Sequence, residues 1–152
     1  MTQAMLSLLE HAQNQRDAAM AELLRGEESA RQLRQQAQQL DSYHADYAAR
    51  APTQNGRTAP IELLRSHLAF MQRLDQAVAQ QHSLLQAAEA QLVQRRQTLV
   101  EREIRVASVR KLLQRRDEVA QRRSSRQEQN RSDEATAQRR WRDSTHSKLL
   151  SH

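Results

Sequence analysis

The sequence contains no cysteine and very little glycine, proline or aromatic side chain. Its 152 residues include two glycines, two prolines and four aromatic residues. Without cysteine the chain cannot form a disulfide framework, a thiolate metal site or a cysteine nucleophile. Because glycine and proline mark most turns, a chain with so few of them can reverse its direction only rarely. The expected fold therefore consists of a few long elements.

Long apolar runs and a secretion signal are also missing. No stretch approaches the roughly 20 consecutive apolar residues that a membrane-spanning helix needs. Residues 1–17 have neither a basic leader nor a small-residue cleavage site, so they do not resemble a signal peptide. These absences predict a cytoplasmic protein without membrane insertion.

The residues that are abundant favour helices, and the chain has one clear break. Alanine, glutamine, arginine, leucine and glutamate dominate, as is typical of long helices and coiled coils. Both prolines and one of the two glycines fall within residues 51–60. Pro52 disfavours helical geometry at the residue before it, and Asn55-Gly56 is a strong turn signal. Thr58 can cap a new helix whose first turn suits Pro60.

This break divides the chain into two predicted helices. The first covers about residues 3–50, the loop covers 51–59 and the second helix covers about 60–140. Two long helices joined by a short loop pack antiparallel. The predicted fold is therefore all-α: a single antiparallel coiled-coil hairpin whose second helix is the longer.

Small and apolar residues recur on both predicted helices at the spacing of a coiled-coil seam. On the first helix, steps of four and three residues connect Met5, Leu9, Ala12, Arg16, Ala19, Leu23, Gly26, Ala30, Leu33, Ala37, Leu40, His44 and Tyr47. On the second, apolar residues recur every seventh position: Leu64, Met71, Val78, Leu85, Leu92, Leu99, Val106, Leu113 and Ala120. A second series is apolar only at intervals: Leu74, Gln81, Ala88, Arg95, Arg102, Val109 and Arg116.

The end of the second helix is predicted to be uncovered and basic. At 1.5 Å per residue the first helix reaches only to about residue 108 of the second, which leaves an overhang of about residues 109–140. Residues 1–101 hold 10 Arg against 11 Asp and Glu, a net charge of −1. Residues 102–152 hold 14 Lys and Arg against 7 acids, a net charge of +7. Weak helix formers at Ser124-Ser125 and Asn130 predict some fraying there.

This basic segment has two interpretations that the pattern leaves open. Its arginines could bind the phosphates of a nucleic acid, or they could form a solvated helix face. Interleaved acidic residues pair with arginines one helical turn away, which dilutes a field for nucleic acid but suits a protein partner of mixed charge. Only Trp141 could stack on a base.

The sequence offers no arrangement for catalysis, a metal or a cofactor. None of its six histidines has a partner at ligand spacing beside an acid, and there is neither a glycine-rich phosphate loop nor an HExxH motif. His44 lies in the predicted seam near Tyr47, where a packing role is expected. A hairpin of two helices also lacks the concave pocket of an enzyme. We expect a non-enzymatic protein without cofactor or metal.

Phe70 lies on one flank of the second helix, about 100° from Met71. Other residues share that flank: Leu63, Leu74, Ala77, Gln81, Leu84 and Ala88. An exposed apolar stripe of this kind indicates a docking surface. Alternatively, the seam is wide and Phe70 folds over the first helix. The pattern alone leaves both possibilities open.

The order of several short motifs resembles the FliJ family of flagellar export proteins. These motifs are Arg16-Asp17-Ala18-Ala19, Tyr43 with Tyr47, Leu68-Ala69-Phe70, Leu74-Asp75-Gln76-Ala77, Arg126-Gln127-Glu128-Gln129 and Asp133-Glu134-Ala135. The resemblance covers nearly the whole chain. It implies a stalk that inserts into the hexameric export ATPase, links it to the membrane export gate and handles export chaperones.

The resemblance also implies one set of contact residues, and the uncovered basic overhang predicts a second. In the family, a Phe, Leu, Ala and His stripe on the second helix contacts the cytoplasmic linker of the gate; the matching positions are Phe70, Leu74, Ala77 and Gln81, the last being Gln rather than His. The ring of the ATPase is expected to contact the basic overhang at Arg110, Lys111, Arg115, Arg116, Arg122 and Arg123. The alternatives are the equivalent stalk of a virulence injectisome and a basic coiled coil associated with nucleic acid.

Overall fold

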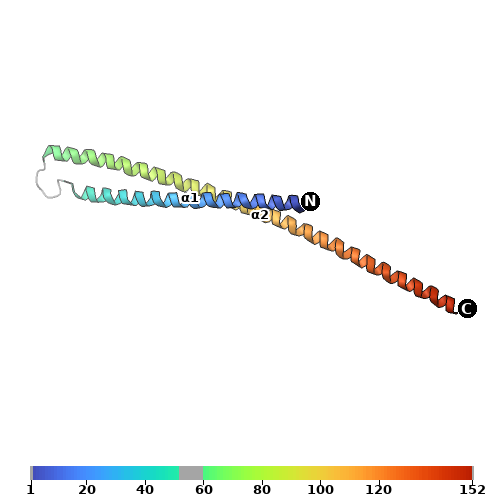
Figure 1. Cartoon of the computed structure of the whole chain (residues 1–152). Helices are drawn as coiled ribbons and strands as arrows, with labels where there is room; N and C mark the ends of the chain where they lie inside the picture. The colour runs from blue at the N-terminus through green and yellow to red at the C-terminus, as the bar shows by residue number, and fades with distance from the viewer. Residues whose placement is uncertain (1, 52–59, 152) are drawn as a thin grey trace. The chain divides into compact units, whose positions relative to one another are not determined.

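The computed structural model describes residues 2–51 and 60–151, which form two helices (Figure 1). Helix α1 is Thr2–Ala49, 48 residues long, and helix α2 is Ile61–Leu150, 90 residues long. The described residues contain no strand. The prediction of an all-α fold with a longer second helix is confirmed. The predicted loop features Pro52, Asn55-Gly56 and Thr58 lie outside the described residues.

Backbone hydrogen bonds mark where the two helices end and begin. After α1, the N–H of Arg50 donates to the carbonyl of Tyr47 at 3.2 Å, which tightens the last turn to three-residue spacing. The carbonyl of Pro60 accepts the first bond of α2, from the N–H of Leu64 at 3.2 Å. Proline fits this position because the first N–H groups of a helix have no helical acceptor. The negative charge of Glu62 in the first turn complements the helix dipole.

Helix α2 is longer than predicted. It passes through Ser124-Ser125 and Asn130 without a break and ends at Leu150 rather than near residue 140. Arginine, glutamine and glutamate dominate this stretch, and all three have high helix propensity. The summed propensity of the segment therefore outweighs the few weak helix formers that suggested fraying.

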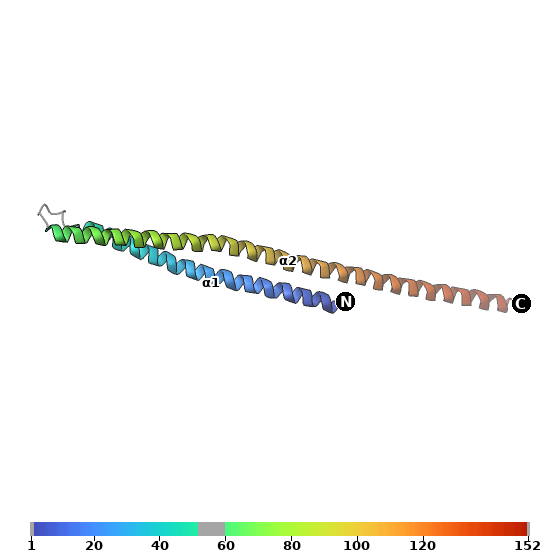
Figure 2. The same ribbon diagram turned by 90° about the horizontal axis from the view of Figure 1, so that it is seen from above.

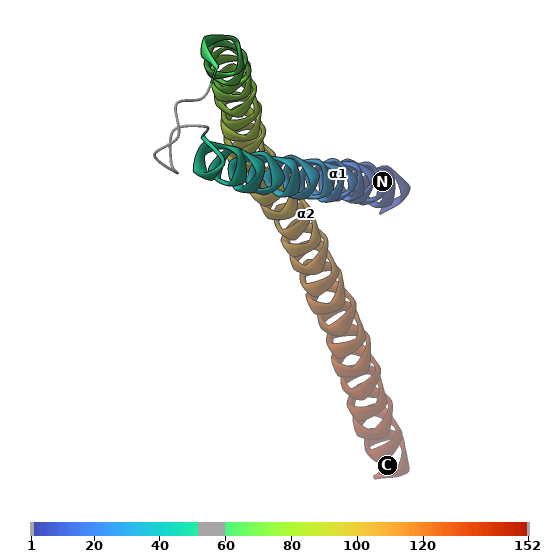
Figure 3. The same cartoon turned by 90° about the vertical axis from the view of Figure 1, so that its left-hand side faces the viewer.

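Contacts divide the chain into two units. One is Glu10–Arg105, and the other holds the residues as far as Leu9 together with those from Val106 onward. In the unit Glu10–Arg105, α1 and α2 lie side by side (Figures 1 and 2). The end of α1 and the beginning of α2 lie at the same end of this pair, as Figure 3 shows from that side. The helices in this unit are therefore antiparallel.

Side-chain pairs give the register of the antiparallel helices. Residues that come later on α1 pair with residues that come earlier on α2: Gln15 with Arg102, Glu22 with Arg95, Arg34 with Glu89, and His44 with Asp75. The centre of the interface is a cluster of Leu23, Ala30, Leu92 and Leu99, with Ala19 and Ala88 packed against it. Small residues on α1 face leucines on α2, so the helices approach closely and interlock.

Burial follows the predicted seam closely. All thirteen seam positions predicted on α1 are buried or half-buried, and so are the predicted positions of the seven-residue series from Leu64 to Leu113. The exception is Ala120, which is exposed, so that part of the prediction was wrong. No described residue of α1 packs over Ala120.

The second unit contains the uncovered part of α2. Val106 and Val109 are buried there, so the uncovered part does not begin at residue 109 as predicted. It begins after the half-buried Leu113: every residue from Gln114 to Ser151 is exposed except the half-buried Thr145. We call residues 114–151 the basic segment, because they hold ten Lys and Arg against six Asp and Glu.

Candidate functional site

One edge of the helix pair in the unit Glu10–Arg105 carries a row of polar pairs that cross between the helices, two Arg–Glu ion pairs and two His–Asp contacts. They are Arg34–Glu89 at 3.3 Å, His82–Asp41 at 3.1 Å, His44–Asp75 at 2.5 Å and Arg96–Glu27 at 3.9 Å. Most of these side chains are exposed, so each pair contributes at most about 1 kcal/mol. Their effect is mainly to occupy this edge with polar groups that already have partners.

The other edge is apolar near the junction of the helices. Tyr43 and Leu63 are 50% and 55% exposed there, and Phe70 is half-buried beside them. Around Phe70 the two edges thus differ in chemistry: one carries the polar pairs, and the other presents apolar side chains to solvent. An apolar edge bordered by polar residues is the more suitable surface for a protein partner.

Phe70 packs against α1 instead of standing free. Its ring centroid lies 4.3 Å from that of Tyr47 and 6.4 Å from that of Tyr43. His67, one turn earlier on α2, stacks on the other side of Tyr47 at 5.9 Å with an interplanar angle of 12°. Of the two possibilities that the sequence left open, the wide seam in which Phe70 folds over the first helix is the one observed.

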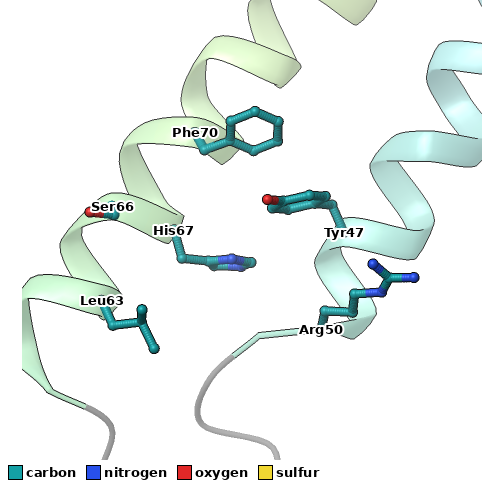
Figure 4. A pocket seen from close by; sticks show the side chains of 6 residues that line it. All are labelled: Tyr47, Arg50, Leu63, Ser66, His67 and Phe70. Atoms are coloured by element: carbon teal, nitrogen blue, oxygen red, sulfur yellow. The ribbon is translucent and has the colours of Figure 1, made fainter.

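These rings line an open cleft of about 450 Å³ (Figure 4). Tyr47 projects from α1 toward His67 and Phe70, which come from α2. The remaining lining residues are Arg50, Leu63 and Ser66. The cleft joins apolar surface with one cation, an arrangement that can receive an apolar side chain of a peptide beside a carboxylate. Sequence reasoning missed Arg50, Ser66 and His67 as cleft residues, although the spacing of His67 and Phe70 opposite Tyr47 was the available signal.

The four predicted gate-docking residues lie in different environments. Phe70 lines the cleft, whereas Leu74 is only 6% exposed and packs inside the interface. Ala77 and Gln81 are half-buried. The amide of Gln81 donates to the side-chain oxygen of Gln36 at 2.9 Å, so it ties α2 to α1. Their contact with an export gate stays a prediction, and in this structure only Phe70 of the four faces an open cleft.

The six residues predicted to contact the ATPase ring are all exposed on α2: Arg110, Lys111, Arg115, Arg116, Arg122 and Arg123. Four of them belong to the basic segment. Acidic neighbours are interleaved with them, including Asp117 and Glu118. The segment therefore offers a helical surface of mixed but predominantly positive charge, which suits a protein surface with acidic patches. Their role likewise stays a prediction.

The described residues hold few features of other functional classes. Within 2–51 and 60–151, no three His, Asp or Glu side chains come together as a metal site would require. Neither described helix contains a stretch that is both long enough and apolar enough to cross a membrane. The hydrogen bond and charge of Glu28 raise the pKa of Arg31 above its ordinary value. That pair lies one turn apart on the exposed surface of α1.

Comparison with known proteins gives one match, and it covers almost the whole chain. The family model of the flagellar FliJ protein matches residues 1–145. No curated protein and no solved structure matched. The matched range includes α1, α2 as far as residue 145, the aromatic cleft and most of the basic segment. The chain therefore belongs to the FliJ family, which is a non-enzymatic family of flagellar export apparatus components.

Proposed function

We propose that this protein is a stalk and adaptor of the flagellar type III export apparatus. It inserts into the hexameric ring of the export ATPase, couples the ring to the cytoplasmic linker of the membrane export gate and handles export chaperones. It acts in the cytoplasm and is held at the inner membrane through the apparatus. The observation that carries the proposal is the family match over residues 1–145.

The basic segment supports the proposed contact with the ATPase. Residues 114–151 form one continuous helix whose side chains are almost all exposed, so α1 leaves them available to a partner. A ring that closes around a helix needs such a surface on every side. Arg115 and Arg122 share one side of the helix, and Arg116 and Arg123 share the side about 100° away, so the four arginines form one broad basic face. Arginine also pairs with carboxylates in two-pronged geometry.

The aromatic cleft supports the proposed contact with the gate. It lies on the apolar edge in the unit Glu10–Arg105, whereas the basic segment belongs to the other unit. A linker peptide could place an apolar side chain against Phe70 and Leu63 and a carboxylate near Arg50. Because the two proposed surfaces share no residue, one protein can contact both partners.

A co-purification experiment tests the proposal. The export ATPase is passed over the immobilised full chain and over a variant with Arg115, Arg116, Arg122 and Arg123 changed to Gln. We expect the variant to retain much less ATPase. The matched control neutralises four exposed arginines outside the basic segment, Arg50, Arg65, Arg73 and Arg105, and should retain it. Equal retention by both variants would show that the basic segment is not the contact.

The two alternatives, an injectisome stalk and a nucleic-acid-binding coiled coil, are distinguished by the family match and by the salt dependence of DNA binding. A match to the flagellar family model favours the flagellum over a virulence injectisome. A basic coiled coil that binds nucleic acid would bind duplex DNA at physiological ionic strength, and its affinity would fall steeply with salt. We expect no such binding, since acidic residues are interleaved along the basic segment.

A further inference from the structure

The last turns of α2 expose three large apolar side chains that lie beyond the arginines proposed to contact the ATPase. Trp141, Leu149 and Leu150 are 68%, 78% and 79% exposed. Few large hydrophobic side chains of this chain are more exposed, and these three lie within ten residues of each other. Exposed apolar side chains that gather at one end of a helix indicate a surface that something covers.

Helical geometry arranges these residues into an interfacial face. Trp141, Thr145 and Leu149 follow each other at intervals of four residues, so they form one stripe along the helix. Arg140 and Arg142 flank Trp141 at about 100° on either side. The one acidic residue of this stretch, Asp143, lies about 160° away from Trp141, on the far side of the helix.

The hydroxyl groups in this stretch are already bonded to the helix backbone. Thr145 Oγ1 donates to the carbonyl of Trp141 at 3.0 Å, with the carbonyl of Arg142 also within 2.9 Å. Ser144 Oγ donates to the carbonyl of Trp141 at 2.9 Å. A hydroxyl that has its partner within the helix costs less to remove from water than a free one. Thr145 can therefore present its methyl group as part of the apolar stripe.

Basic residues surround the stripe. Residues 138–150 contain four basic side chains, Arg139, Arg140, Arg142 and Lys148, and one acidic side chain. Lys148 lies beside Leu149, and its long side chain can keep the ammonium group in water while the stem lies along an apolar surface. An apolar stripe that contains a tryptophan and has arginines on both flanks is typical of helices that lie in the headgroup region of a bilayer.

The geometry points to a lipid-binding site: the face of α2 formed by Trp141, Thr145 and Leu149 binds the surface of a bilayer that contains anionic phospholipid. Tryptophan and leucine enter the headgroup boundary, and Arg140, Arg142 and Lys148 contact the phosphates. The helix lies on the membrane and does not cross it. This contact is made by the chain itself and does not depend on the proposed contacts with the ATPase or the gate.

Trp141 provides a direct measurement, because it is the single tryptophan of the chain. The full-length protein is titrated with vesicles of phosphatidylcholine alone and with vesicles that also contain phosphatidylglycerol. We expect the emission of Trp141 to shift to the blue, and the protein to co-sediment, only with the anionic vesicles. High salt should weaken this binding, since the charges are exposed. No shift with either vesicle, or an equal shift with both, would overturn the proposal.

Matched variants test the face and the charge separately. Leu149→Ser removes an apolar side chain from the stripe and should weaken vesicle binding about tenfold, while Leu150→Ser, on the other side of the helix, should weaken it less. Arg140→Gln with Arg142→Gln should weaken binding more than Arg122→Gln with Arg123→Gln, which removes the same charge elsewhere. All these positions are exposed, so circular dichroism should show unchanged helix content.

Two results would contradict this assignment. Equal weakening by the two arginine pairs would mean that overall charge, and not this face, controls the interaction. A blue shift of Trp141 with duplex DNA that is insensitive to Leu149→Ser would show a nucleic-acid arm instead of a lipid-binding face.

Discussion

The guanidinium group of Arg95 lies directly against Gly26 at the interface of the two helices. A Cβ atom at position 26 would be 2.4 Å from Nη1 of Arg95 and 3.0 Å from Cδ2 of Leu92. From this position Arg95 donates a hydrogen bond to the backbone carbonyl of Glu22 at 3.2 Å, and its other terminal nitrogen lies 3.8 Å from the carboxylate of Glu22. Glycine thus makes room for an arginine at a seam position that coiled coils usually fill with an apolar residue.

We predict that Gly26 and Arg95 are energetically coupled. In an exposed helix, Gly→Ala stabilises by about 1 kcal/mol. Here Gly26→Ala should lose most of that gain, because the methyl group displaces Arg95 from the carbonyl of Glu22. In an Arg95→Ala background the obstruction is gone, and Gly26→Ala should stabilise by about 1 kcal/mol. Chemical denaturation of the four proteins of this double-mutant cycle gives the coupling energy. Additive effects would show that the contact does not constrain the interface.

A second prediction concerns the adjacent residues Leu92 and Val93. Leu92 is 6% exposed and belongs to the central cluster, whereas Val93 is 61% exposed. Leu92→Asp buries an unpaired carboxylate and should cost several kcal/mol of unfolding free energy. Val93→Asp makes the same kind of change on the surface and should cost less than about 1 kcal/mol. Thermal melts of both variants check this. Similar melting temperatures would mean that the interface is misplaced by one residue.

Phe70→Ala is predicted to lower the stability of the helix pair. The ring packs on Tyr47 and Tyr43 but is only half-buried. The expected loss is about 1–3 kcal/mol, below the roughly 3–5 kcal/mol for a fully buried phenylalanine. Binding of the gate linker, measured well below the melting temperature, should also weaken if Phe70 forms part of the docking surface. A loss of stability without any loss of linker binding would assign Phe70 to packing alone.

The fold could be predicted from the sequence because its two main signals are local. Clustered turn residues placed the break between the helices, and the spacing of small and apolar residues placed the seam. The series failed only at Ala120, where periodicity continues but α1 has ended. The periodicity of one helix does not show over what length the other helix covers it. The predicted end of α2 near residue 140 rested on isolated serines and Asn130. The end at Leu150 shows that the helix propensity summed over their neighbours outweighs these weak helix formers.

The candidate site was less predictable, since it depends on contacts between distant residues. The sequence placed Phe70 and Leu74 on the same flank, but it could not show that Leu74 is covered while Phe70 lines a cleft. That difference arises from the register of α1, which sets Tyr43 and Tyr47 against Phe70. The role of Gly26 was likewise hidden, because an isolated glycine in a helix gives no indication of the arginine that it accommodates.

The register itself can be measured with pairs of spin labels. The chain has no cysteine, so each introduced cysteine is unique. Labels that replace Asp41 and His82, which bond across the interface at 3.1 Å, should lie close together. Labels at Asp41 and Arg96 should be farther apart, because fourteen residues of helix correspond to about 21 Å. A shorter distance for the second pair than for the first would exclude the antiparallel register.

The central claim, that this protein acts on the export ATPase through the basic segment, is tested most directly by the rate of ATP hydrolysis. The purified ATPase is assayed alone, with the full chain and with a chain truncated after Leu113. The truncated chain keeps every buried residue of the interface, so its helix content per residue should be unchanged. We predict that the full chain stimulates hydrolysis and that the truncated chain does not. Equal stimulation by both proteins would contradict the proposal.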